Sequence, residues 1–394
     1  MIDTIYIGLS GLHGFERGLR VISNDTANLN TPGFKSSSLL FADLFHASGG
    51  LGGGGGQAYG QYGYGLNTLG TVLNFDQGQF QTTGNDLDLA VDGLGLFVLR
   101  DDAGHMHYTR DGQFKFNAEG VLVSVTTGEQ VMAFDATGNL AQVSIASLRT
   151  SAARATTSIT FSGNLSSTTT TDTVGGVTVI DQAGTSHSLQ ARLDPVAGTP
   201  GSWTVTLLDG TTTVGTGTIA FINGQPDPAN SRVSITYTPT GQPAVPLSLD
   251  FSSNVTSFDS GSRSTLAVAS QDGFGAGDLV SAAFDSGGTL QLTYSNGQVV
   301  QGARVALARF SSQDAIAAIS DNEFEATDAR AWQTGVAGEQ GFGTVRSGMI
   351  EASNVNLSQE FSDLVIMQRG YQACSQVIST ANDMLTELFG MRGK

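Results

Sequence analysis

The first thirty residues carry apolar positions on a heptad spacing. Steps of three and four alternate along one row, and six of its eight members are apolar: Ile5, Gly8, Leu12, Phe15, Leu19, Ile22, Thr26 and Leu29. This spacing puts the row on one face of a helix, a rod of about 40 Å that ends near Asn30. Pro32 and Gly33 follow and predict the end of the helix.

A second heptad pattern occupies the other end of the sequence. One row recurs every seven residues and is wholly apolar: Leu357, Leu364, Tyr371, Ile378 and Leu385. The alternate row is mixed: Phe361, Gln368, Ser375, Asn382 and Phe389. Asn356 with Gln359 three residues later resembles a capping box, so we expect the helix to begin there and to extend about 50 Å.

We expect the two terminal helices to pair as an antiparallel coiled coil. Their apolar rows have similar lengths, and no comparable row lies between them in the sequence. A contact between only two helices buries little apolar area against the entropy of ordering its residues, so further copies of the chain are natural partners. The alternative, two ordinary amphipathic helices packed on a globular core, stays open at this point.

The middle of the chain changes to a period of two, which predicts strands. Apolar residues alternate there with polar or small ones in six runs: Leu87, Leu89, Val91; Phe114, Phe116; Val121, Val123, Val125; Trp203, Val205, Leu207; Val233, Ile235, Tyr237; and Leu290, Leu292, Tyr294. Turn dipeptides punctuate this region: Asp92-Gly93, Asp111-Gly112, Asp209-Gly210, Asn223-Gly224, Asp272-Gly273 and Asn296-Gly297. Such dipeptides suit tight hairpins, so the expected fold class is mainly β with α-helical termini.

Breaks in composition divide the chain further. The stretch Ala47–Gly65 is glycine-rich and has too little apolar side chain for a core, which predicts a flexible joint. From 155 to 180 the chain is rich in Thr and Ser with only Asp172 charged, which suits solvent-facing strands of a separate domain. The expected division is an N-terminal helix at 1–34, a joint at 35–72, an inner β domain at 73–150 and 271–350, an inserted outer β domain at 151–270, and a C-terminal helix at 351–394.

Net charge excludes two classes of partner. The chain has 394 residues and a net charge of -17, which gives it no electrostatic footprint for nucleic acid or for an anionic membrane surface. The N-terminal stretch lacks a basic leader with an uninterrupted apolar core, and no run of 18 apolar residues occurs elsewhere. We therefore expect no membrane insertion, and export, if it occurs, without a cleaved signal peptide.

The sequence offers no pattern for catalysis, a cofactor or a metal. Cys374 is the only cysteine and falls among apolar residues of a predicted helix, so we expect a small, buried and unreactive thiol. The five histidines are scattered; His105 and His107 share a strand face but have no third ligand pattern nearby. Acidic pairs such as Glu323/Glu325 arise by chance in so acidic a chain. We expect no catalytic residue, no cofactor and no metal site.

Two long motifs resemble a known family. The stretch NDTANLNTPGFK, at 24–35, resembles the N-terminal signature of the bacterial flagellar rod and hook axial proteins, and SGMIEASNVNLSQEFSDLVIMQRGYQACSQVI, at 347–378, is similar to their C-terminal signature. Shorter matches lie at 75–99 and 108–123. The motif residues are Asn24, Ala27, Asn28, Asn30, Thr31, Pro32, Gly33, Phe34, Lys35, Glu351, Ser353, Asn354, Val355, Gln368, Arg369 and Tyr371. Cys374 and Gly370 depart from the usual asparagine and alanine.

Segments in the middle of the chain indicate which members of the family this sequence resembles most. Segments at 162–165, 177–189, 202–210 and 271–280 resemble the larger body of the hook members, with the weakest likeness at about 223–270. A distal rod protein of the basal body is the alternative within the family, and the middle insertion disfavours it. A secreted adhesive or carbohydrate-binding β protein is the alternative outside the family, and it leaves both heptad rows without a role.

The resemblance implies a structural polymer and no enzyme. Hook subunits stack into a curved hollow tube, with terminal helices lining the channel, that transmits torque from rod to filament as a universal joint and passes exported proteins. The implied partners are further copies of the chain, the distal rod, hook cap, length-control and hook–filament junction proteins, and the type III export apparatus. Gln368, Ser375 and Asn382 would then fix helix register or face the wet channel, and Asn24, Asn28 and Asn30 would cap the end of the first helix.

Overall fold

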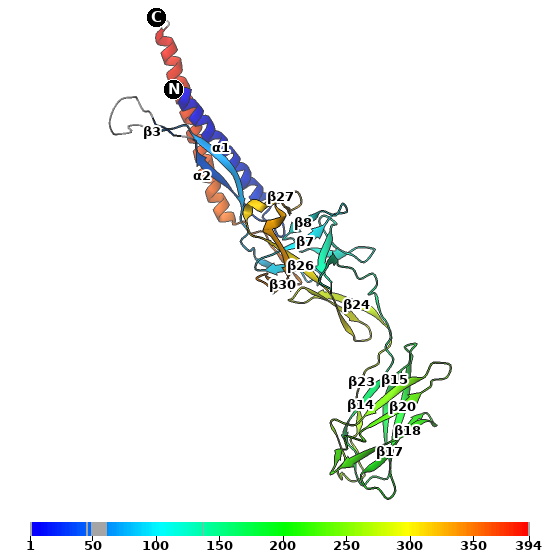
Figure 1. The fold of residues 1–394 in the computed structure, drawn as a ribbon. Coiled ribbons are helices and arrows are strands. Elements are labelled where there is room, and N and C mark those ends of the chain that lie inside the picture. Colours follow the sequence, from blue (N-terminus) through cyan, green and yellow to red (C-terminus); the bar gives the residue numbers. More distant parts are fainter. Residues whose placement is uncertain (1, 45, 49–60, 136, 393–394) are drawn as a thin grey trace. The chain divides into compact units, whose positions relative to one another are not determined.

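The structure is a computed structural model that describes residues 2–44, 46–48, 61–135 and 137–392. The described chain divides into two compact units, and Figure 1 shows the elements of both. Unit 1 comprises residues 1–146, 282–291 and 301–394, and unit 2 comprises residues 147–281 and 292–300.

Two terminal helices of unit 1 lie side by side, as the heptad patterns predict (Figure 1). Helix α1 spans Ile2–Ala27 and helix α2 spans Leu357–Arg392. The α-helix ends three residues before Asn30, and residues 28–30 form a turn in which the Asn28 amide donates to the Asn24 carbonyl at 3.1 Å. Asn356 caps α2 as expected, because its Oδ1 accepts from the Ser358 amide at 3.1 Å. The pairing of the termini is confirmed.

A β-hairpin that the sequence pattern did not predict packs on α1. Strand β1 (Ser37–Asp43) pairs antiparallel with β4 (Leu66–Leu73), and the register shifts between Leu40 and Phe41. The short strands β2 (His46–Ser48) and β3 (Gln61–Gly63) continue the same arrangement. The expected glycine joint thus includes paired strands, and its residues 49–60 lie outside the described part of the chain.

The β body of unit 1 is an antiparallel sheet with the order β26-β11-β7-β8-β28-β27. Two short ladders, β30 with β6 and β31 with β5, join the stretch before α2 to this body. The strands of this unit are β5 Phe80–Thr82, β6 Leu89–Asp92, β7 Leu96–Arg100, β8 Met106–Thr109, β9 Phe114–Phe116, β10 Leu122–Ser124, β11 Gln130–Phe134, β12 Leu140–Gln142, β27 Ile316–Ala318, β28 Glu323–Ala326, β29 Trp332–Val336, β30 Thr344–Ser347 and β31 Met349–Glu351. Its core is apolar and aromatic; Phe97 and Phe114 meet edge to face with ring centroids 5.1 Å apart.

Unit 2 contains two five-stranded sheets, ordered β20-β21-β14-β22 with β23 beside β14, and β15-β16-β17-β18-β19. Close contact between sheets depends on glycine, since a Cβ on Gly217 of β18 would lie 2.2 Å from Val233 Cγ1 on β20. Its strands are β13 Thr150–Ser151, β14 Ser158–Asn164, β15 Asp172–Ile180, β16 Ser186–Pro195, β17 Ser202–Asp209, β18 Thr212–Ile222, β19 Gln225–Pro226, β20 Arg232–Tyr237, β21 Val245–Asp250, β22 Val255–Thr256 and β23 Ala267–Gln271. Three strands contain residues of both units: β24 Gly277–Phe284, β25 Thr289–Tyr294 and β26 Val299–Phe310.

The predicted fold class, mainly β with helical termini, is confirmed. Alternation in sequence becomes alternation in burial, most clearly in β20 and β25, where every second residue is buried. The Asn223-Gly224 dipeptide forms the β18–β19 turn with both residues at positive φ, 53° and 77°. Among the described helices, none is long and apolar enough to cross a membrane.

Candidate functional site

Helix α2 packs against α1 by seating side chains over glycines. A Cβ added to Gly8 would lie 2.9 Å from Ile378 Cγ1, and one on Gly11 would lie 2.7 Å from the Cys374 sulfur. Farther along α1, a Cβ on Gly18 would lie 2.9 Å from the Met367 sulfur. Residue numbers rise along α1 as they fall along α2, so the pair is antiparallel.

One contact runs in the opposite sense, from α1 to a glycine on α2. The Phe15 ring covers Gly370, where an added Cβ would lie 2.5 Å from the ring carbons. Gly14, on another side of α1, faces the hairpin, because its Cβ would lie 2.5 Å from Leu66 Cδ2. The glycines of the first helix therefore let two different elements approach its backbone.

The structure brings together only part of the predicted heptad rows. On α1, Ile22 is buried, and four residues are half-buried: Ile5, Leu12, Phe15 and Leu19. Leu29, in the turn that follows α1, is also half-buried. On α2, half-buried positions are Leu364, Ile378 and Leu385. Four other predicted apolar row members are exposed: Leu357 by 37%, Phe361 by 53%, Tyr371 by 37% and Phe389 by 65%.

The alternate contact row of α2 lies one residue before the expected one. Met367, Cys374 and Ala381 face α1, whereas the predicted positions Gln368, Ser375 and Asn382 are exposed. From each apolar row position, a heptad allows the next contact three or four residues later. The step of three leads to apolar or small residues, and two of them, Met367 and Cys374, lie over glycines of α1. The polar side chains at 368, 375 and 382 consequently do not set the register of this pair.

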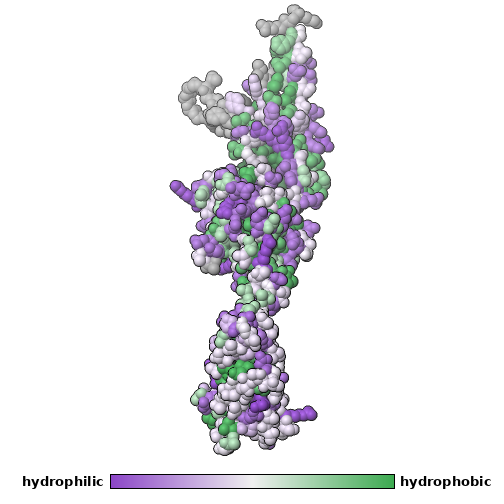
Figure 2. All heavy atoms as spheres, turned by 90° about the vertical axis from the view of Figure 1, so that its right-hand side faces the viewer, coloured by the Kyte–Doolittle hydropathy of each residue, from purple (hydrophilic) through white to green (hydrophobic). Residues whose placement is uncertain are grey.

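An exposed apolar stripe runs along α2, and we call it the outer stripe. Its members lie eleven, seven, four and three residues apart, which keeps them near one side of a helix with 3.6 residues per turn. They are Ile366, Val377, Met384, Leu388 and Met391, exposed by 60, 43, 46, 51 and 83%. Figure 2 shows apolar residues gathered along the helical end of the molecule. Exposed apolar side chains gathered on one side of a helix favour an interaction site.

A buried ionic junction fixes both helix ends on the β body. Glu351, fully buried, accepts from Lys35 Nζ at 2.7 Å, from Arg110 Nε at 2.5 Å and from the Gly78 amide at 2.8 Å. Lys35 follows α1 and Glu351 precedes α2, so the pair joins residues 316 positions apart in sequence. Burial lowers the pKa of the Lys35 ammonium, more than the Glu351 charge raises it.

Backbone carbonyl oxygens accept further hydrogen bonds from the Lys35 ammonium and the Arg110 guanidinium. Lys35 Nζ also donates to the Asp76 carbonyl at 2.8 Å. Arg110 donates to the carbonyls of Val91 at 2.7 Å, Gly93 at 2.8 Å and Gly95. Since a buried charge is costly unless it is paired and hydrogen-bonded, this satisfied network specifies one arrangement of the chain at the junction.

Backbone hydrogen bonds from motif residues tighten the same junction. The Gly33 amide donates to the Glu351 carbonyl at 2.7 Å, and Gly33 has φ 67°, a conformation that suits glycine. A Cβ there would lie 2.5 Å from the backbone of Arg110. Asn354 accepts from the Ser36 amide at 2.7 Å and donates to the carbonyls of Asn74 and Asp76 at 2.8 and 3.0 Å.

The asparagines at the end of α1 hydrogen-bond locally. Asn28 Nδ2 donates to the Asn24 carbonyl at 2.9 Å, and Asn28 Oδ1 accepts from Thr31 Oγ1 at 3.0 Å. Pro32 contributes a carbonyl that accepts from Asn322 Nδ2 at 2.9 Å. These contacts satisfy backbone groups that the helix end leaves without an intrahelical partner.

Two carboxyl groups approach each other where α1 ends and α2 begins. Asp25 is fully buried, and its Oδ2 accepts from the Ser37 amide at 2.9 Å. Burial raises the pKa of Asp25 despite the Ser37 hydrogen bonds. Burial also raises the pKa of Glu360, and the charges of Asp25 and Asp363 raise it further.

The remaining motif residues take no part in the ionic junction. Ala27, Asn30, Gln368 and Arg369 are exposed. Phe34 accepts through its carbonyl from the Asn354 amide at 3.3 Å, Ser353 Oγ accepts from the Val355 amide at 3.3 Å, and Val355 itself is buried.

Sequence reasoning gave no role to Arg110, Asp25 or Gly78. Arg110 and Gly78 stand inside stretches that match the family, yet nothing in their spacing marks a buried cation or a carboxylate contact. The rarity of lysine could have drawn attention to Lys35 as a residue with a specific role, because the chain has only three lysines: Lys35, Lys115 and Lys394.

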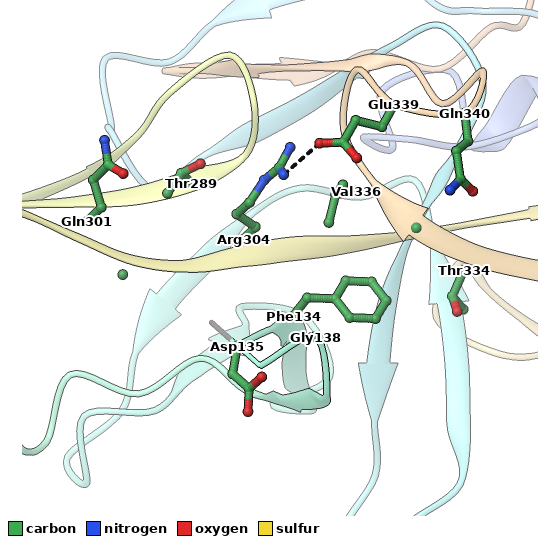
Figure 3. Close-up of a pocket in the computed structure, with 12 residues that line it drawn as sticks. Phe134, Asp135, Gly138, Thr289, Gln301, Arg304, Thr334, Val336, Glu339 and Gln340 are labelled. Carbon is green, nitrogen blue, oxygen red and sulfur yellow. Dashed lines mark hydrogen bonds and ion pairs between the residues drawn. The ribbon is translucent and has the colours of Figure 1, made fainter.

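A surface pocket of about 660 Å³ lies on the β body of unit 1 (Figure 3). Its charged lining residues are Arg304, Glu339 and Asp135. Arg304 donates through Nη1 to Glu339 Oε1 at 2.8 Å, and Asp135 Oδ1 accepts from the Asn139 amide at 2.9 Å, so all three already have partners. Phe134, Thr334 and Gln340 are among the other lining residues, and the described lining contains no histidine or cysteine. The pocket offers no pairing of nucleophile and base among these residues.

Family models match two segments of the chain. The segment 90–178 matches the family described as flagellar hook protein FlgE/F/G D1 domain, and the segment 346–391 matches the flagellar basal body rod FlgEFG protein C-terminal family. The second match covers nearly the whole of α2, and the first begins in β6.

Relatives cover almost the full chain. It is 32% identical to the flagellar hook protein FlgE of Salmonella typhimurium over 98% of both chains, and 30% identical to that of Borreliella burgdorferi over 100% of both. The flagellar hook protein FlgE of Escherichia coli is 31% identical over 98% of both chains. Among solved structures, that of Helicobacter pylori flagellar hook protein FlgE2 has a similar fold, with a TM-score of 0.54, 15% identity and coverage of 69% of this chain and 100% of that one.

Proposed function

The chain belongs to the flagellar hook protein FlgE family, and we propose that it polymerises through its terminal helices into the curved hollow tube of the bacterial hook. The outer stripe carries this proposal. Its five side chains are apolar, and each is at least 43% exposed although the residues lie on an ordered helix. Covering such a side chain contributes about 1.5–3 kcal/mol, so neighbouring copies have a reason to dock there.

The helix pair by itself supports the same conclusion. Four of its contacts place a side chain over a glycine rather than over another apolar side chain, so the pair gains close approach but little buried apolar area. Isolated helices depend on tertiary packing for their stability. Docking of further copies on the outer stripe would supply the missing burial.

The ionic junction suits the mechanical task of a hook. Torque passes along the tube only if the helical core and the β body of each subunit turn together. Glu351, bound by Lys35 and Arg110 at 2.7 and 2.5 Å, ties both helix ends to that body through charged hydrogen bonds that no exposed pair would match. The same reasoning predicts a stiff subunit core beneath more loosely packed outer strands.

We extend the proposal to partners and location by family membership. The subunit would leave the cell through the flagellar type III export apparatus, without a cleaved signal peptide, and would act outside the cell in the hook. Its expected partners are the distal rod, hook cap, length-control and hook–filament junction proteins. We propose a purely structural role with no catalysis.

Electron microscopy of basal bodies tests this function. Cells lacking the protein should make rods that carry no hook and no filament, and the full chain supplied from a plasmid should restore both. Rods truncated before their distal end would instead indicate a distal rod protein. Normal hooks in the deletion strain would contradict the proposal.

A further inference from the structure

Three side chains from separate parts of the β body of unit 1 meet in a cluster that the hook function does not use. His107 lies on β8, Glu129 immediately before β11, and Glu323 at the start of β28. His107 Nδ1 is 2.8 Å from Glu129 Oε1 and 3.4 Å from Glu323 Oε2. One donor atom from each residue lies within 4.8 Å of the others.

Strand pairing explains why these residues converge. Thr109 of β8 pairs with Glu323 of β28. His107 is two residues from Thr109 and therefore on the same face of the sheet, which makes Glu323 its diagonal neighbour. Glu129 arrives from the turn between β10 and β11, whose backbone is fixed by the Ser124 amide donating to the Glu129 carbonyl at 2.9 Å.

The cluster has unmet bonding capacity. The side chains of His107, Glu129 and Glu323 are only 17, 15 and 5% exposed. Glu129 Oε2 and Glu323 Oε1 are buried and have no hydrogen-bond partner among the described residues. Both carboxylates also point to the same ring nitrogen, which carries at most one proton and cannot satisfy two acceptors well. Burying two carboxylates beside one imidazole is costly unless their charge is compensated, and a bound cation would compensate it.

We propose that His107, Glu129 and Glu323 bind a divalent transition-metal cation, with Zn²⁺ as the best-fitting ion. Zn²⁺ accepts imidazole nitrogen and carboxylate oxygen at about 2.0–2.2 Å, which separates two ligand atoms on a tetrahedral ion by about 3.3 Å. The two measured separations bracket that value. Imidazole disfavours Ca²⁺ and Mg²⁺, which prefer oxygen ligands.

The geometry defines what the ion would do. Three protein ligands leave a fourth position for water. Glu323 also lines a pocket of about 790 Å³, together with Asn322 and Thr126. The bound ion would join β8, β28 and the β10–β11 turn. It would therefore stiffen the β body next to the junction with the terminal helices, since Asn322 also holds the Pro32 carbonyl.

Zinc binding by the full chain tests the site. After chelator treatment and dialysis, titration calorimetry with Zn²⁺ and metal analysis should give one ion per chain. His107→Gln and Glu323→Gln should each weaken binding at least tenfold. Two matched controls replace exposed neighbours of the same types, His105→Gln and Glu325→Gln, and should bind as the parent does.

Absence of binding, or binding that survives both His107→Gln and Glu323→Gln unchanged, would overturn the proposal. Circular dichroism checks that each variant folds. Should either variant unfold, Co²⁺ added to the parent chain decides the matter: strong visible absorption typical of four-coordinate cobalt is expected, and only the weak absorption of the hydrated ion would contradict the site.

Discussion

The ring of Phe15 on α1 fills the space that Gly370 leaves open on α2, where a Cβ atom would lie 2.5 Å from Phe15 Cε1. The sequence alone marks Gly370 as a departure from the family's usual alanine and as a weak point of about 1 kcal/mol in a helix. In the folded pair Gly370 contributes to packing, because the absence of a Cβ atom lets the Phe15 ring lie directly against the backbone of α2.

Gly370→Ala should therefore destabilise the helix pair. A methyl group forced against the Phe15 ring costs about 1–3 kcal/mol, and we expect this cost to exceed the roughly 1 kcal/mol that alanine adds to helix propensity. Fewer assembled hooks per cell and a lower thermal midpoint of the helical signal are expected. Gly390→Ala is the control, because nothing lies within 4 Å of a Cβ at that position of α2. A Gly370→Ala chain as stable as the parent would contradict the packing described for Phe15.

Loss of the Glu351 charge should be far more damaging than loss of an exposed pair. Glu351→Gln leaves the buried Lys35 and Arg110 cations without their shared carboxylate, a change that costs about 3–5 kcal/mol. Arg346→Gln, which breaks an exposed pair with Asp92 at 2.6 Å, should cost about 0–1 kcal/mol. Urea unfolding of the two variants measures the difference. Equal losses of stability would show that the junction is not a specific network.

The contact between Asp25 and Ser37 should open more easily as the pH rises. Burial raises the pKa of Asp25, so its carboxyl binds a proton more tightly in the folded chain than in the unfolded one. The stability that this proton contributes is fully present below the unfolded pKa of about 3.9 and is lost as the pH rises through the folded pKa. The Asp25–Ser37 contact reports this opening, because the Ser37 amide donates to Asp25 Oδ2 at 2.9 Å.

Hydrogen exchange at the Ser37 amide measures that effect. After correction for intrinsic exchange rates, the opening equilibrium of the parent should increase as the pH rises above about 4. Asp25→Asn should flatten this dependence, whereas Asp3→Asn, at an exposed position near the other end of α1, should preserve it. An identical pH profile in Asp25→Asn and the parent would exclude Asp25 as its source.

Local pattern was enough to predict the elements but not their exact contacts. Heptad spacing predicts both helices, and alternation predicts strands such as β20 and β25, because burial on one face follows from periodicity alone. The contact row of α2 differs by one residue, since spacing cannot show that Met367 and Cys374 would lie over Gly18 and Gly11 of α1. The pairing of β1 with β4 was not predicted, because a long glycine-rich stretch separates the two strands in sequence and no short turn dipeptide joins them.

The buried charges were beyond prediction for a different reason. Lys35, Arg110 and Glu351 come from three distant segments, and only the folded chain shows that they share one site. The same holds for His107, Glu129 and Glu323, whose proximity depends on strand register. Residue types alone made an exposed position the more plausible expectation for each of them.

Electron microscopy of tubes assembled by the purified full chain is the most direct test of polymerisation through the outer stripe. Replacement of two stripe residues, Ile366→Ser with Met384→Ser, should abolish tubes while the circular dichroism spectrum of the monomer stays unchanged, because both side chains are exposed in the single chain, by 60 and 46%. The control Gln376→Ser, on an exposed polar position of α2, should assemble like the parent. Normal tubes from the doubly substituted chain would contradict assembly through this stripe.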